Sequence, residues 1–358
     1  MLARRPTQAP YGHEHPERFA QIVEKWDAYT AGYMSPILPK ILRASAGFFA
    51  VLLLLPMPAC FGWGSDGHRM INRLAAEKLP AGVPAFLQTA AAIDEVEYLG
   101  PEPDRWRSMG EPELSNSQAP EHFIDLELAD MVGRLPRRRF EFIADLYAQG
   151  LMHPDLAQQL RPERVGLQPY VTTEVYQRLK AAMREYREQS AARKDTKPVE
   201  QAIVFYAGWL GHYVGDGSQP LHVTVNYDGW VDKENPSGYT TAHGIHSKFE
   251  TAFVATNLKA ADVAPLMTPP LLVGDVFDDY VAYLRRSASL VQRTYQLEKL
   301  GGFDGPGTVE SKQFTAERLA AAASELRNLY YTAWIESGKP VPERPGTTPA
   351  SGKPSAGL

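Results

Sequence analysis

The run Gly-His-Tyr-Val-Gly-Asp-Gly-Ser-Gln-Pro-Leu-His over residues 211–222 constrains this chain more than any other segment. It continues an apolar helical stretch, and His212 and Asp216 are four residues apart, so both side chains leave the same helix face. Pro220 is expected to end the helix and turn His222 back toward the same place. A buried carboxylate needs a partner, and imidazole and carboxylate are groups that bind zinc. The run therefore predicts a metal site inside a helical core.

The rest of the chain also favours helices over strands. Apolar residues recur at helical spacing over 70–79 and over 140–147. No stretch shows the sustained alternation of apolar and polar residues, with a period of two, that is typical of a strand. Longer helices are predicted over 170–192, 198–216, 246–260, 273–298 and 313–337. We therefore expect an all-α fold, built as a single compact multi-helix domain.

Residues 34–62 have the features of a secretory leader. Lys40 and Arg43 precede an apolar stretch over 47–55, which is shorter than the roughly 20 residues that span a membrane. Small residues suit cleavage after Gly62. We expect a signal peptide and a product that is secreted or periplasmic.

The two ends of the chain have separate interpretations. Residues 1–33 have no place in a signal peptide, so Met34 is the expected true start. The folded domain is predicted over 63–338. Residues 339–358 are rich in Pro, Gly, Ser and Thr and are predicted to be disordered.

Cys60 is the only cysteine, and it leaves one alternative for the leader. In this alternative the chain is cleaved just before Cys60, and Cys60 is then lipidated. Under either reading the folded domain contains no pair of cysteines, so disulfides cannot stabilise it. Bound metal is a natural substitute, because its binding free energy adds to the folding free energy.

The chain is acidic. Its formal net charge is −5, and removal of residues 1–62, with six basic and four acidic side chains, makes it −7. An acidic chain is not a bulk electrostatic binder of duplex nucleic acid.

Other potential ligands lie far from the opening run. His246 and Glu250 repeat the spacing of four, and His68, His122 and Asp104 stand in ligand-like settings. A single histidine on a helix is more often structural than a ligand, and Asp104 alone could be a turn or capping residue. The joint pattern, with two such pairs and a turn histidine, predicts metal binding and indicates more than one ion.

These residues stand in motifs that resemble a known superfamily, the trinuclear zinc phosphodiesterases, which joins zinc-dependent phospholipases C to single-strand-specific zinc nucleases. The resemblance covers nearly all of residues 63–337. Its landmarks occur in order: Trp63-Gly-Ser-Asp-Gly-His68, Asp104-Arg-Trp-Arg107, His122-Phe-Ile-Asp125, His212 to His222, and His246 to Glu250.

The resemblance implies three zinc ions and a ligand set for each. The first set is His122, His212, Asp104 and Asp216; the second is His222, His246 and Glu250; the third is His68, Asp216 and Trp63. Trp63 would contribute its free amino nitrogen and its carbonyl oxygen. That amine exists only if cleavage falls after Gly62.

The resemblance also implies hydrolysis of phosphodiesters, with Asp104 orienting or deprotonating the attacking water. Arg107 would bind phosphate oxygens, and in the nuclease branch Phe123 would stack on a base. Without the resemblance, Arg107 reads as a surface ion pair and Phe123 as core packing. The expected substrate partner is single-stranded nucleic acid or phospholipid, and we expect a monomer without a stable protein partner.

The choice of substrate stays open. The Trp63–His68 spacing, Asp104-x-x-Arg107 and the loop between His222 and His246 are similar to the nucleases. Glu250 and the motif His-Ser-Lys-Phe-Glu are closer to the phospholipases. We favour an exported single-strand endonuclease, with phospholipase C as the alternative and a catalytically inactive zinc-binding protein as a third possibility.

Overall fold

The computed structural model describes residues 63–341, and helices account for its regular structure. Within this part of the chain there are no β-strands, only the isolated bridges Ile124–Gly166 and Tyr227–Gly229. The all-α prediction is confirmed. The leader and the tail beyond residue 341 lie outside the described residues, so those predictions stay untested.

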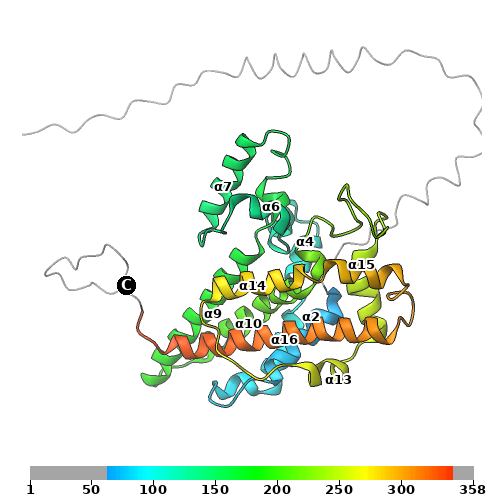
Figure 1. Ribbon diagram of the computed structural model, residues 1–358. Helices are drawn as coiled ribbons and strands as arrows, with labels where there is room; N and C mark the ends of the chain where they lie inside the picture. The colour runs from blue at the N-terminus through cyan, green and yellow to red at the C-terminus, as the bar shows by residue number, and fades with distance from the viewer. Residues whose placement is uncertain (1–62, 342–358) are drawn as a thin grey trace, which may run out of the picture. The chain divides into compact units, whose positions relative to one another are not determined.

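Helix α10 (Lys197–Ser218) is the central element (Figure 1). It packs against α2 (Gly64–Glu77), α3 (Ala90–Leu99), α9 (Gln168–Ala191) and α16 (Val309–Ser337). From Ala207 to Ser218 every residue except Trp209 is buried. A helix that is apolar on all sides must be surrounded, which accounts for this position.

Small residues on α10 allow α2 to approach closely. A β-carbon at Gly215 would lie 2.9 Å from Nδ1 of His68, and one at Gly211 would overlap the amide of Asn72. That amide donates to the carbonyl oxygens of Val96, at 2.8 Å, and Gly208, at 3.0 Å, and so joins α2 to α3 and α10. The helix that carries His212 and Asp216 is thereby fixed against the helix that carries His68.

Helix α16 is the longest element, with 29 residues. Thr308 and Ser311 form a capping box at its start, and the helix packs along α2, α9 and α10. Near its other end the Tyr330 hydroxyl donates to the Ala207 carbonyl of α10 at 2.6 Å. The Tyr330 hydroxyl therefore ties the C-terminal part of α16 to the central helix.

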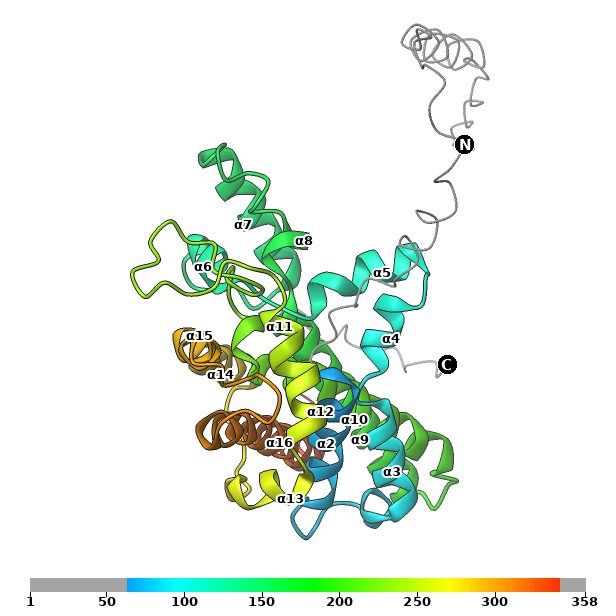
Figure 2. The same cartoon turned by 90° about the vertical axis from the view of Figure 1, so that its right-hand side faces the viewer.

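Shorter helices connect α3 to α9. They are α4 (Glu102–Ser108), α5 (Pro112–Gln118), η2 (Ala119–Glu121), α6 (Leu126–Ala129), η3 (Asp130–Val132), α7 (Arg139–Met152) and α8 (Pro162–Val165), while η1 (Ala85–Gln88) precedes α3. In both views α6 and α7 lie at the opposite end of the described domain from α13 (Ala260–Val263) (Figure 2).

Helix α7 confirms the helical spacing over 140–147, but that apolar stripe faces outward. Phe140 is 82% exposed and Tyr147 is 50% exposed. The helix is held instead by Phe142 and Leu146, which are fully buried. The spacing identified the helix but not the face that packs.

Two predicted long helices are interrupted. The segment 246–260 is divided into α11 (Ile245–Ser247), the π-helical segment η5 (Lys248–Phe253) and α12 (Val254–Asn257). The segment 273–298 forms α14 (Val276–Ala288) and α15 (Val291–Lys299), separated at Ser289 and Leu290. The remaining short helices are η4 (Pro220–His222) and η6 (Ala264–Leu266). None of the helices in this part of the chain is long and apolar enough to cross a membrane.

Candidate metal centre

Helix α10 supplies the middle of the site. His212 and Asp216 lie on one face as predicted, with His212 Nε2 at 3.3 Å from Asp216 Oδ2, and both are fully buried. Pro220 follows the end of α10 and starts the short η4 turn, which brings Nδ1 of His222 to 3.8 Å from the same carboxylate oxygen. Asp216 therefore faces imidazoles from two elements.

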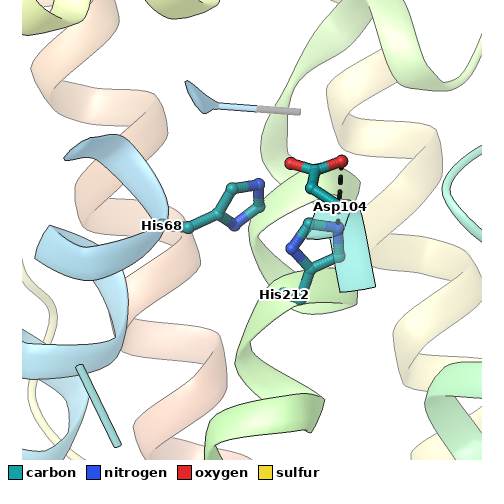
Figure 3. A group of neighbouring side chains, drawn as sticks. All are labelled: His68, Asp104 and His212. Carbon is teal, nitrogen blue, oxygen red and sulfur yellow. Dashed lines mark ion pairs between the residues drawn. The ribbon is translucent and has the colours of Figure 1, made fainter. Parts of the chain in front are cut away.

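His122 and Asp104 complete the first group. His122 Nδ1 lies 2.9 Å from His212 Nε2 and 3.2 Å from Asp216 Oδ2. Asp104 Oδ1 lies 3.7 Å from His122 and 3.9 Å from His212. Asp104 comes from the short helix α4, and its carboxylate points toward His212 and His68 (Figure 3).

His68 lies on the other side of Asp216. Its Nε2 is 3.3 Å from Asp216 Oδ1, and its ring stacks on that of His212 with centroids 4.1 Å apart. Trp63 is also buried nearby, since its indole N–H donates to the Gly215 carbonyl at 2.7 Å and lies 2.9 Å from the Ser218 hydroxyl. The two oxygens of Asp216 thus face different histidines.

A second group gathers around Glu250. Its Oε2 lies 2.9 Å from His246 Nε2 and 3.3 Å from His222 Nε2, and these two nitrogens are 3.1 Å apart. Gln219, which the sequence reasoning did not single out, donates its amide N–H to the same oxygen at 2.9 Å. The position of Gln219 before Pro220 predicts a turn, but nothing in the sequence indicates that its side chain contacts Glu250.

Backbone carbonyls fix the orientation of three histidines. Nδ1 of His212, His222 and His246 lies 2.8–3.0 Å from the carbonyl oxygens of Gly100, His122 and Tyr227 respectively. A carbonyl only accepts, so each Nδ1 must donate, and each Nε2 is left facing the carboxylates. Histidine ligands of metals are generally held in this way.

Two properties of the imidazole and carboxylate groups suit metal ions: the distances between their ligand atoms, and buried polar atoms that have no hydrogen-bond partner. Two ligand atoms at zinc's usual bond length in a tetrahedral arrangement are about 3.3 Å apart, close to the separations of 2.9–3.3 Å around Asp216 Oδ2 and Glu250 Oε2. Buried atoms without a hydrogen-bond partner in the described chain include His122 Nε2 and Glu250 Oε1. Buried polar atoms rarely stay unsatisfied. Three sets of side chains could hold an ion: His68, Asp104 and His212; His122, His212 and Asp216; and His222, His246 and Glu250.

The protein alone stabilises the charged forms of His222 and Glu250 and disfavours the charged form of His122. Burial would lower the pKa of His222, but the carboxylates of Asp216 and Glu250 outweigh burial and raise that pKa to about 9. Burial would raise the pKa of Glu250, yet His246 and His222 lower it to about 2. Burial lowers the pKa of His122 to about 4, and the positive charge of Arg107 acts in the same direction.

A cavity of about 560 Å³ opens onto the two groups. His122, His222 and His246 line it, together with Arg107 and Phe123. Arg107 donates to Asp104 Oδ1 at 2.9 Å and also lines the cavity. Phe123 is half-buried on the wall.

Asp125 is a cavity residue to which the sequence analysis gave no role. Burial, with the nearby charge of Glu127, raises the pKa of Asp125 to about 8. The residue was visible in the His-Phe-Ile-Asp motif, but its backbone hydrogen bond to Val165, at 2.7 Å, joins segments 40 positions apart that no local pattern connects.

Comparison with known families adds to this geometry. A model of the family "S1/P1 Nuclease" matches residues 63–326, which include every side chain of both groups. The chain belongs to the S1/P1 nuclease family. The match begins at Trp63, the residue at which the mature chain was expected to start, and it confirms the resemblance found in the motifs.

Two further similarities are weaker. A protein of Bradyrhizobium tropiciagri named "Probable serine protease" is 29% identical over 170 residues, 38% of this chain, which spans about a fifth (21%) of that curated relative. The structure of alpha-toxin from an avian strain of Clostridium perfringens has 13% identity and a TM-score of 0.34, over 79% of this chain and 66% of the toxin. Neither one bears on the site of this S1/P1 family member.

Proposed function

We propose that this protein is an exported, zinc-dependent phosphodiester hydrolase that cleaves single-stranded DNA and RNA. The observation that carries the proposal is the cluster of buried imidazoles and carboxylates, with unsatisfied atoms, at the wall of a cavity that also contains Arg107 and Phe123. Membership in a family named for nucleases supports the same reading.

The residues divide among three zinc ions in this proposal. Asp104, His122, His212 and Asp216 would hold the first ion. His222, His246 and Glu250 would hold the second, and His68, Asp216 and the backbone of Trp63 would hold the third. The position of the Trp63 indole beside Gly215 and Ser218, on either side of Asp216 in sequence, supports the third set. Bound zinc would supply polarisation of the phosphate and a pKa of water lowered toward ~7.

The protein's own groups then have distinct tasks. Asp104 keeps one carboxylate oxygen on Arg107 and leaves Oδ2 without a partner, so Oδ2 can accept the proton of the attacking water. The Arg107 guanidinium faces the cavity and binds a non-bridging phosphate oxygen, which gains negative charge in the transition state. Phe123 offers a ring on which an unpaired base stacks.

Phospholipase C activity is the second candidate. The same cavity is lined by Leu128, Leu221 and Val225, which suit an acyl-glycerol group. His246 and Glu250 also form the motif that is closer to phospholipases. This alternative keeps the reaction and changes only the leaving group.

One assay separates the candidates. Zinc-loaded protein beginning at Trp63 is incubated with single-stranded DNA, RNA, duplex DNA and phosphatidylcholine vesicles, beside an Asp104→Asn control. We expect cleavage of the two single-stranded substrates by the wild type and a large loss in the control. Cleavage of lipid alone would replace the first candidate with the second, and silence on every substrate would favour an inactive zinc-binding protein.

Export and processing have their own test. N-terminal sequencing of the protein recovered outside the cytoplasm is expected to begin at Trp63. A product that retains Cys60 would contradict cleavage after Gly62, and with it the amine that the third set requires. Sedimentation of the same sample is expected to show a monomer.

A further inference from the structure

A second cavity, of about 540 Å³, adjoins the cavity at the metal centre. The two share Gln158, Glu163 and Arg164 in their walls, while Asn116 and Arg161 line only the second. None of the metal-ligand candidates lines the second cavity. A ligand that extends from the metal centre would therefore pass Arg164 to enter it.

The two arginines differ in their pairing. Arg161 lies 3.5 Å from the Glu163 carboxylate, at a side-chain exposure of 50%. Arg164 is exposed, and across residues 63–341 its guanidinium has neither a hydrogen bond nor an ion pair. With two arginines and one glutamate, the charged side chains of the wall sum to a positive charge, and Asn116 and Gln158 add neutral polar groups.

The backbone holds Arg164 in a fixed relation to the first cavity. Val165, the next residue, is fully buried, and its carbonyl accepts from the Asp125 N–H at 2.7 Å. The following residue, Gly166, pairs with Ile124, beside Phe123. Arg164 is therefore anchored to the segment that carries His122 and Phe123.

We propose that the second cavity is a phosphate-binding subsite that holds a neighbouring phosphodiester of the same strand, with Arg164 as its main contact and Arg161 as a further one. The inference rests on the proposed function and specifies its substrate as a polymer. Guanidinium groups bind phosphate by paired hydrogen bonds, and an unpaired one beside a cavity gains most from an anion. A phospholipid has a single phosphodiester and would leave this subsite unused.

The test compares substrates of increasing length. Values of kcat/KM are measured for a small chromogenic phosphodiester, a dinucleotide, a tetranucleotide and a hexanucleotide. The wild type is expected to prefer the longer oligonucleotides. Arg164→Ala is expected to lose about three- to tenfold on these, and less than about twofold on the two smallest substrates.

Three controls make the outcome specific. Lys194→Ala removes an exposed charge that lines neither cavity and is expected to change nothing. Arg164→Lys is expected to recover part of the loss. The salt dependence of kcat/KM on the hexanucleotide is expected to weaken in Arg164→Ala by a log–log slope of about 0.7, the value for one lost single-strand phosphate contact.

Two results would overturn the inference, and they are distinguishable. If Arg164→Ala loses equally on all substrates, or if the wild type shows no preference for length, the subsite is refuted while cleavage of nucleic acid stands. If the wild type cleaves no oligonucleotide, the proposed function is refuted and the subsite with it.

Discussion

At the residue scale, Asp216 has the most contacts to other candidate ligands. Its oxygens lie within 3.8 Å of His68, His122, His212 and His222. Burial would raise the pKa of Asp216, but the imidazoles of His212 and His222 keep it well below its usual range. The carboxylate is therefore ionised inside the core.

Replacement of Asp216 by alanine is expected to disturb two zinc sites together. The change leaves buried imidazoles without their counter-charge, so we expect the free energy of unfolding to fall by about 3–5 kcal/mol. Elemental analysis is expected to show the loss of more than one equivalent of zinc. The exposed Asp94→Ala is the control, and unchanged metal content in Asp216→Ala would contradict the assignment of Asp216 to two zinc sites.

The protonation of His222 predicts a pH dependence of metal binding. A pKa of about 9 means that metal-free protein carries this proton at neutral pH, and a metal ligand must lose it. The charged imidazole stabilises the metal-free fold fully below its unfolded pKa of about 6.5, and that contribution disappears as the pH rises through about 9.

Zinc affinity is accordingly expected to increase about tenfold per pH unit for this proton, up to a pH of about 9. Calorimetric titration in buffers of different ionisation enthalpy would measure the protons released. His153→Ala removes an exposed histidine outside the cluster and is expected to leave their number unchanged. Binding without proton release at neutral pH would refute the assignment.

The sequence predicted the placement of some groups better than others. The spacing of four within His212/Asp216 and His246/Glu250 is local geometry, and both pairs do meet, at 3.3 and 2.9 Å. The hydrogen bond from Gln219 to Glu250 joins residues 31 positions apart. No periodic pattern in the sequence predicts the contact between Gln219 and Glu250, because it forms only when η4 and η5 lie side by side in the fold.

At the element scale, the approach of α2 to α10 depends on glycine. Gly211→Ala would place a methyl group on the Asn72 amide, so we expect a loss of about 1–3 kcal/mol in the free energy of unfolding. Gly150→Ala in α7 is the matched control. A β-carbon at Gly150 would have its nearest neighbour at 3.5 Å, which is an ordinary contact. Because alanine favours a helix more than glycine does, this change is expected to be neutral or to stabilise the fold by up to about 1 kcal/mol.

Thermal denaturation of both variants and the wild type measures the difference. Equal melting temperatures for Gly211→Ala and Gly150→Ala would show that α2 can move away at no cost. A second readout is zinc content, because displacement of α2 also moves His68.

The sequence patterns predict that a helix exists better than they predict where it ends or which side of it is buried. The helical spacing of residues 273–298 continues through Ser289 and Leu290, yet the helix breaks there. Neither residue is glycine or proline, so the sequence pattern gives no signal for the break. On α7 the stripe with Phe140 is as regular as a core stripe, and only the fold reveals that Phe142 is the buried side.

At the scale of the whole molecule, metal is expected to replace covalent cross-links. The described domain contains no cysteine, and the candidate ligands come from elements as far apart in sequence as α2 and η5. An ion at a free concentration of 100 times its dissociation constant adds about 2.7 kcal/mol to stability. Each zinc, if bound as proposed, would therefore stabilise contacts between distant elements.

Chelation is expected to lower the melting temperature by several degrees, and added zinc to restore it. Scanning calorimetry with and without chelator measures the shift. A phosphine reductant, which has no thiol to compete for zinc, serves as the control and is expected to have no effect. A domain that melts at the same temperature after zinc removal would contradict a structural contribution of the metal.

The length of α16 has a practical consequence for any shortened version of the protein. The family match ends at residue 326, in the middle of this helix. Truncation there would delete Leu329, Tyr330 and Ala333, which are buried, and would expose apolar faces of α9 and α10. Expression of residues 63–326 alone is therefore expected to yield aggregated material. A version that extends to Val341 keeps all of α16 and the buried side chains that it packs against α9 and α10.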